Sequence, residues 1–125
     1  MRKMKRPTIT YKVEPSFNDK ERLHVVIAWD DHRGQFMFDI KKGIGPNKRR
    51  WLAESPDLDE ILRDTATLHL PLNVDGPAGL DGTGYHFQIG GVPSVTIFWW
   101  MEMPAEWGAL KSIVDRIHCL VEKDQ

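Results

Sequence analysis

The chain has 125 residues, of which 41% are hydrophobic and 28% charged, and its formal net charge is −1. This length suits one domain with a single core, and no stretch approaches the roughly twenty apolar residues that a membrane-spanning helix requires. A single cysteine excludes an internal disulfide and favours a reducing compartment, so we expect a cytoplasmic protein.

The small net charge hides a strong polarity along the chain. Residues 1–50 contain 13 Lys and Arg against 6 acidic residues, a net of +7, whereas residues 51–125 contain 4 against 12, a net of −8. If these parts separate in space, the molecule has one face for an anionic partner and another for a cationic one. If strands and helices interleave, the charges mix instead.

The first part of the chain predicts three strands after a disordered basic tail at residues 1–6. Apolar residues alternate with polar ones at residues 8–13, 23–29 and 35–40. The four residues from Asp31 to Gly34 close the last two segments into an antiparallel hairpin, with Gly34 able to adopt positive φ.

Residues 41–50 predict an exposed loop, because Gly43, Gly45 and Pro46 interrupt any regular pattern. Lys and Arg neutralise phosphates and an indole can stack on a base. The loop is therefore a candidate nucleic-acid-binding site, the alternative being an ordinary solvated loop. The candidate residues are Lys41, Lys42, Lys48, Arg49, Arg50 and Trp51.

A short helix follows the basic segment. Ser55 supplies a capping hydroxyl, Pro56 suits the first helical position, and the carboxylate of Asp57 lies near the positive end of the helix dipole. The helix is expected to end near Thr65. Residues 68–72, LHLPL, alternate again and predict an edge strand, since Pro71 cannot donate to a central ladder.

The last third predicts a hairpin and a long helix. The alternation over residues 85–89 and 95–101 indicates two strands, which we expect to pair with Ile89 opposite Pro93 and Phe87 opposite Val95. From Pro104 onward the spacing changes to three and four, which predicts a helix to Glu122 with one apolar stripe. The stripe comprises Trp107, Leu110, Ile113, Val114, Ile117, Leu120 and Val121.

The resulting order of elements is β-β-β-α-β-β-β-α, and its short connections favour antiparallel pairing. We therefore predict an α+β fold in which residues 1–125 form a single two-layer domain. An antiparallel β-sheet of about six strands would carry two helices, one short and central and one long and C-terminal, packed on one face.

No sequence pattern indicates an enzyme. We find no Ser-His-Asp order, no nucleophile elbow and no paired metal motif, so we expect neither catalytic residues, nor a metal, nor a cofactor. Asp115, His118 and Glu122 share a helix face, but the ordinary interpretation is a solvated surface. Cys119 lies mid-helix, and we interpret it as a buried structural thiol. Asp30 is interpreted as a turn residue.

Residues 80–121 carry a resemblance in the segments DGTGYHFQI, SVTIFWW and MPAEW and in the apolar helix. They resemble a hairpin and helix found in small bacterial proteins, some of which look like immunity proteins that neutralise polymorphic or contact-delivered toxins. The resemblance implies a non-enzymatic protein-binding role, with the toxin recognised by surface shape and charge.

Two large aromatic side chains provide the candidate partner site. Phe98 and Trp100 fall on the strand face opposite Val95 and Ile97, where they either form a second core layer or bind a partner. If the partner is a basic toxin domain, carboxylates of the short helix would assist. These are Asp57, Asp59 and Glu60. The alternative function is a nucleic-acid-binding accessory protein that uses the loop at residues 41–50.

Overall fold

The computed structural model describes residues 8–16, 19–71, 74, 82–90 and 94–123. Over these residues the chain forms six strands, two α-helices and three short 3-10 turns. The strands are β1 (Thr8–Pro15), β2 (Leu23–Asp30), β3 (Gln35–Lys42), β4 (Arg49–Ala53), β5 (Thr83–Gly90) and β6 (Val95–Trp100). The helices are α1 (Leu58–Ala66) and α2 (Gly108–Lys123).

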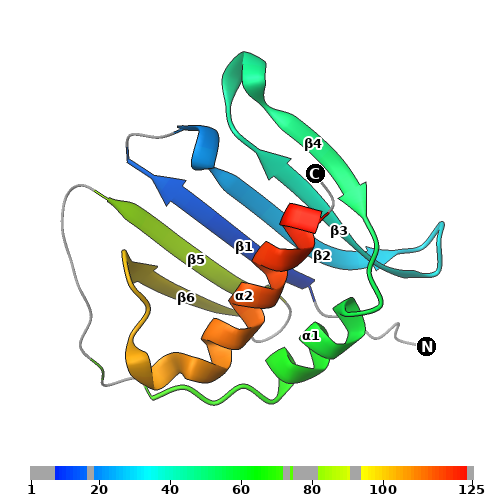
Figure 1. Cartoon of the computed structure of the whole chain (residues 1–125). Helices are drawn as coiled ribbons and strands as arrows, with labels where there is room; N and C mark the ends of the chain where they lie inside the picture. Colours follow the sequence, from blue (N-terminus) through cyan, green and yellow to red (C-terminus); the bar gives the residue numbers. More distant parts are fainter. Residues whose placement is uncertain (1–7, 17–18, 72–73, 75–81, 91–93, 124–125) are drawn as a thin grey trace.

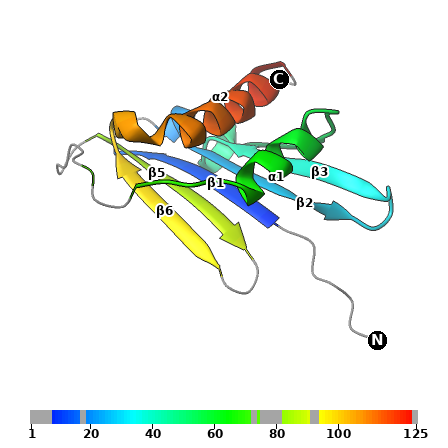
Figure 2. The same cartoon turned by 90° about the horizontal axis from the view of Figure 1, so that it is seen from below.

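All six strands belong to one antiparallel sheet, in the order β4-β3-β2-β1-β5-β6. Both helices lie on the same face of this sheet, and no described helix covers the other face (Figures 1 and 2). The predicted α+β architecture, with one short and one long C-terminal helix on one face, is confirmed. We call the uncovered side the open face.

Strand β1 joins the two parts of the sheet. It pairs with β2 on one side, where Tyr11 lies opposite Val25, and with β5 on the other, where Tyr11 lies opposite Phe87. Odd-numbered residues of these strands face the helices, as the alternation predicts; most are buried, and Tyr85 and Ile89 are partly buried. The first strand of the chain therefore lies at the centre of the core.

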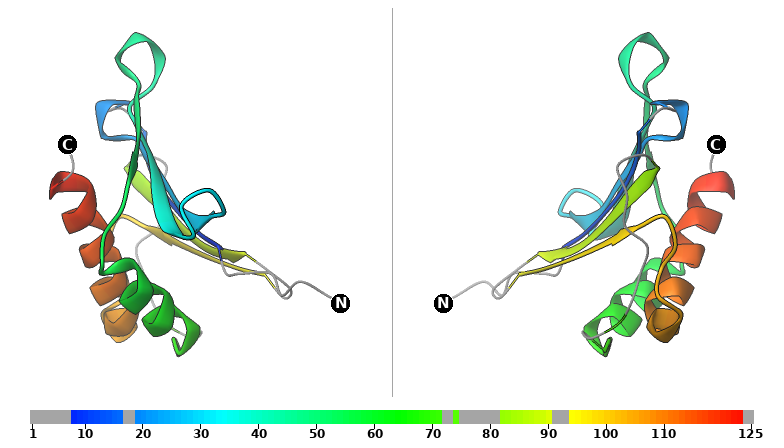
Figure 3. Two further views of the ribbon diagram at one scale, coloured as in Figure 1. Left: turned by 90° about the vertical axis from the view of Figure 1, so that its right-hand side faces the viewer. Right: turned by 90° about the vertical axis from the view of Figure 1, so that its left-hand side faces the viewer.

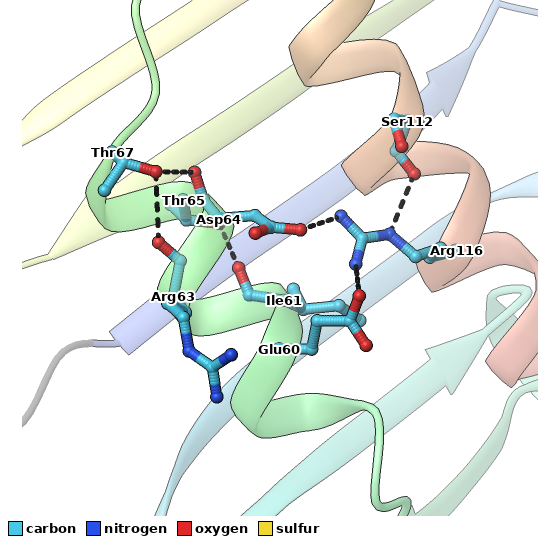
Figure 4. A network of polar contacts seen from close by, with 8 residues as sticks. All are labelled: Glu60, Ile61, Arg63, Asp64, Thr65, Thr67, Ser112 and Arg116. Atoms are coloured by element: carbon cyan, nitrogen blue, oxygen red, sulfur yellow. Dashed lines mark hydrogen bonds and ion pairs between the residues drawn. The ribbon is translucent and has the colours of Figure 1, made fainter.

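The predicted apolar stripe is the buried side of the long C-terminal helix. A 3-10 turn at Ala105–Trp107 precedes α2, and every predicted stripe residue is at most 9% exposed. Arg116 connects this helix to α1 (Figure 4). Its guanidinium donates to Asp64 at 2.6 Å and lies 3.5 Å from the carboxylate of Glu60. These ion pairs are partly exposed and contribute little, so burial of the apolar stripe stabilises the packing of α2 more than they do.

Two predicted elements are wrong. Arg49–Ala53, expected to continue a loop, forms β4 and pairs with β3, so that Lys41 lies opposite Arg50 and Ile40 opposite Trp51. The described part of the predicted edge strand, residues 68–71, forms no strand. The number of strands is nevertheless six, because one unpredicted strand replaces one predicted strand.

The hairpin register differs from the prediction by two residues. Ile89 lies opposite Val95 and Phe87 opposite Ile97, and Gly90, expected in the loop, continues β5 and lies opposite Thr8. A shift of two leaves each side chain on its expected face, so an alternating pattern cannot distinguish the two registers. The expected loop residues 91 and 92 and the expected partner at 93 lie outside the described residues, as does the basic tail.

The start of α1 also differs from the prediction. The helix begins at Leu58, and its N-cap is Asp57 rather than Ser55. The Ser55 hydroxyl instead accepts a hydrogen bond from the Asp57 amide at 3.2 Å, in a turn that leads into the helix. The end at Ala66 lies one residue beyond the expected position.

The buried stripe predicts the effect of shortening its side chains. Ile113 and Ile117 are each 1% exposed, so Ile113→Ala and Ile117→Ala should each lower the free energy of unfolding by about 2 to 5 kcal/mol. Lys111→Ala, on the exposed side of α2, should cost less than about 0.5 kcal/mol. Urea denaturation measures all three, and equal midpoints would contradict the packing described.

Candidate partner-binding surface

The last strand of the sheet presents aromatic side chains on the open face. In β6, Trp99 is buried and stacks on Tyr85 with ring centroids 5.4 Å apart. Its neighbours Phe98 and Trp100 point to the other face, where Phe98 is 50% exposed and Trp100 is half-buried. Figure 3 shows from two sides that both helices lie away from this face. The open face, not a second core layer, therefore receives the two aromatics.

A glycine on the neighbouring strand makes room for these rings. A β-carbon at Gly84 would lie 3.2 Å from the ring of Phe98 and 3.3 Å from that of Trp100. His86, the next residue of β5 on the same face, lies opposite Phe98, and their ring centroids are 4.9 Å apart. Its Nε2 lies 3.4 Å from the carboxylate of Glu14. The rings are thus held close to the sheet.

Met101 completes this surface in an unusual backbone conformation. Its φ is 64°, the only positive value among described non-glycine residues, and the Glu102 amide donates to the Trp100 carbonyl at 2.8 Å. This is a γ-turn of the rare type with positive φ at its central residue. The Met101 amide donates to the Thr83 carbonyl at 2.8 Å, and the Thr83 amide donates to the Met101 sulfur at 3.3 Å.

We refer to His86, Phe98, Trp100 and Met101 as the aromatic patch. Strained backbone concentrates at functional sites, where it fixes the position of side chains before a ligand binds. Aromatic rings supply rigid apolar contact area, and methionine adapts to the shape of a partner. The arrangement is therefore suited to binding, and none of its groups forms a nucleophile and base pair.

The carboxylates expected to assist the aromatics lie elsewhere. Asp57, Asp59 and Glu60 precede or begin α1, in the helix layer on the opposite side of the sheet (Figure 2). Glu60 also contacts Arg116 of the other helix. The structure therefore does not bring the two parts of the predicted partner site onto one surface.

The basic segment is a hairpin whose charges are divided between the two faces. Alternation along β3 and β4 places Lys41 and Arg50 on the open face, and Lys42 and Arg49 on the other; Lys48 lies between the strands. The guanidinium of Arg50 donates twice to the carboxylate of Asp39, at 2.8 and 3.1 Å. These cations do not form a single phosphate-binding surface.

Trp51 does not present a free stacking surface. Its ring is partly buried and packs against the core, and the guanidinium of Arg49 lies 5.2 Å from its centroid. The indole nitrogen is buried without a hydrogen-bond partner among the described residues. A base could not stack on this indole without displacing Arg49.

A row of polar residues crosses the open face and ends at the aromatic patch. Register places one residue from each strand in the line Arg50, Lys41, His24, Lys12, His86 and Phe98. Burial, and then the neighbouring lysines, lower the pKa of His24. Sequence reasoning did not find this row, because alternation gives the face of each residue but not the order of the strands.

A hydrogen-bonded pair lies on the covered side of the sheet. The hydroxyl of Tyr11 and Nε2 of His118 are 2.7 Å apart. Burial raises the pKa of Tyr11, so its hydroxyl stays protonated, and the tautomer of His118 decides which of the two groups donates. Burial also lowers the pKa of His118, an effect that the carboxylates of Glu122 and Asp115 partly offset. His118 is therefore neutral at pH 7 and turned towards the sheet.

Three smaller sequence interpretations can be compared with the structure. Asp30 accepts hydrogen bonds from the amides of His32 and Arg33, as expected of a turn residue. Cys119 is exposed, contrary to the prediction, because it falls outside the apolar stripe. Asp115 pairs with Lys111 at 2.7 Å, and no metal-binding cluster of His, Cys, Asp or Glu occurs in the described ranges.

Comparison with family models, curated proteins and solved structures finds no match to this chain. No helix in the described part of the chain is long and apolar enough to cross a membrane.

The buried histidine predicts how stability depends on pH. The pKa of His118 is lower in the folded than in the unfolded chain. Below about pH 6.5 the unfolded chain therefore binds more protons at this histidine than the folded chain does. The free energy of unfolding should therefore decrease between pH 7 and 5. His118→Gln should reduce this dependence, and Ser112→Ala on the same helix should not. Urea denaturation at several pH values measures the slope, and an unchanged slope in His118→Gln would contradict the assignment.

Proposed function

We propose that this chain is a non-enzymatic protein-binding module that acts in the cytoplasm, and that its partner docks on the aromatic patch. The observation that carries the proposal is the pair of aromatic side chains on the face without helices, with Phe98 half exposed. Single exposed hydrophobic residues need no explanation, whereas grouped aromatic and methionine side chains are typical of binding surfaces.

The local backbone supports a binding role for this patch. Gly84 lets the rings lie against the sheet, and the turn at Met101 fixes where the strand leaves it. A surface that is already ordered loses less conformational entropy when a partner binds. Truncation of the central aromatics should therefore cost more binding free energy than truncation of an isolated apolar residue elsewhere on the same face.

The charges of the open face favour a protein partner over a nucleic acid. Lys12, Lys41 and Arg50 share this face with Glu14 and Asp39, and Arg50 is already paired with Asp39. A nucleic-acid surface neutralises successive phosphates and gains affinity with each unpaired cation. A mixed and nearly balanced surface is more typical of a protein interface with a polar rim.

The resemblance of residues 80–121 to immunity proteins suggests the class of partner. We propose that the partner is a bacterial toxin, which this chain neutralises by binding. The patch would supply the apolar anchor. Because the carboxylates at the start of α1 lie in the other layer, they would contribute only if the toxin also reaches around the sheet.

Substitution in the patch tests this proposal. The partner to use is the toxin-like product of the neighbouring gene, and binding is measured by isothermal titration calorimetry. We expect Trp100→Ala and Phe98→Ala each to weaken binding by about 30-fold or more, the effect of losing a central aromatic anchor.

Leu52→Ala is the matched control, because Leu52 is 51% exposed on the same face at the opposite edge of the sheet. Its affinity should stay within about 3-fold of the unsubstituted chain, as for a residue outside an interface. Equal losses in all three variants, or none in any, would exclude the patch as the docking site.

The nucleic-acid alternative has a different signature. If residues 41–50 bound nucleic acid, each phosphate contact removed would lower the slope of log affinity against log salt by about 0.7 to 0.9. We expect filter binding with single- and double-stranded DNA and RNA to detect no tight, salt-sensitive complex. Such a complex, if abolished by alanine at Lys41, Lys42, Lys48, Arg49 and Arg50, would favour the alternative over a toxin partner.

A further inference from the structure

The two edges of the sheet differ in charge. At one edge, β4 begins with two arginines and follows Lys48, and charged residues of this kind prevent strands from pairing edge to edge. At the other edge, no residue from Ser94 to Met101 is charged. The β6 edge therefore lacks the usual protection against pairing with another strand.

The hydrogen-bonding groups of β6 alternate in direction. The Met101 amide donates to the Thr83 carbonyl, so in this antiparallel ladder the odd residues of β6 bond to β5. The backbone groups of Thr96, Phe98 and Trp100 consequently point away from the sheet. Among the described residues, no backbone group outside β5 pairs with residues 95–99.

Exposed apolar side chains are concentrated at the same edge. The described residues include five exposed large hydrophobics, and three of them are Val95 at 47%, Phe98 at 50% and Met101 at 49%. On the helix side, a groove of about 460 Å³ runs beside the strand and is lined by Leu68, Leu70, Ile97 and Trp107, among others. Both sides of the edge thus offer apolar contacts to an added strand.

We propose that β6 pairs with β6 of a second copy of this chain, antiparallel about a two-fold axis, with Phe98 opposite Phe98 of the second copy. The charge pattern favours a second copy at this edge, because two uncharged β6 edges meet without repulsion, whereas two β4 edges would place arginines opposite one another. A two-fold arrangement uses the same edge of both copies and closes the assembly at a dimer.

The pairing goes beyond the proposed docking of a partner and does not depend on it. Pairing takes place in the plane of the sheet, so the open face of each copy remains accessible and the two aromatic patches become adjacent. A dimer that binds no toxin would contradict the proposed function alone. A monomer that binds a toxin through Trp100 would contradict this inference alone.

Light scattering after size-exclusion chromatography tests the assembly at about 100 µM, where an interface of micromolar affinity is largely occupied. We expect twice the mass of the 14.4 kDa chain. Thr96→Lys places a charge on the exposed edge and should halve the mass, whereas Leu52→Lys at the opposite edge should not. A monomeric unsubstituted chain, or a Thr96→Lys dimer, would overturn the proposal.

Cross-linking tests the register and does not depend on the folding of Thr96→Lys. Opposite residues in a hydrogen-bonded antiparallel pair have Cα atoms about 5.5 Å apart, within the range of a disulfide. In a Cys119→Ser background, Phe98→Cys should form a covalent dimer on oxidation at least about 10-fold faster than Leu52→Cys, since only the former is held beside its copy. Equal rates would overturn the pairing.

Discussion

The pairing of β1 with β5 is the constraint on which the rest of this structure depends. It runs from Thr8 opposite Gly90 to Pro15 opposite Thr83 and joins the strands of the basic first part to the C-terminal hairpin. Only in this pairing does Tyr11 lie beside Phe87, beneath the long helix and within reach of His118. Without it, β5 and β6 would form a two-stranded sheet apart from the other four strands, and an isolated two-stranded hairpin is at best marginally stable in water.

Coverage of only one face determines where each kind of chemistry is found. On the covered face, burial keeps Tyr11 protonated and His118 neutral, so these groups serve the stability of the core. On the open face, Phe98 and the row of cations and histidines remain accessible. The basic part of the sequence does not form one basic face, because alternation places Lys41 and Arg50 on the open face and Lys42 and Arg49 on the other.

Local patterns were sufficient to predict most elements but not their pairing. Alternation correctly places Phe98 away from the helices, and the spacing of apolar residues correctly identifies the buried side of α2. The same reasoning missed β4, because a strand at a sheet edge can carry charges on both faces, and RRW then looks like a loop. It wrongly predicted a strand at residues 68–71, the described part of the expected edge strand, because alternation alone does not supply a neighbour to pair with.

The details of the aromatic patch were less predictable. The two glycines in DGTG suggest a turn, but nothing local indicates that Gly84 lies beneath two rings or that Met101 adopts positive φ. Both facts depend on the register between β5 and β6. An alternating pattern cannot distinguish registers that differ by two residues.

The central position of the first strand has a kinetic consequence. Residues paired between β1 and β5 are separated by about 70 to 80 positions, and closing such a long loop costs only slightly more free energy than closing one half as long. The cost in rate is larger, because chains dominated by distant contacts fold in about milliseconds to seconds. During synthesis β1 emerges long before its partner β5, so the centre of the sheet cannot close until most of the chain has been made.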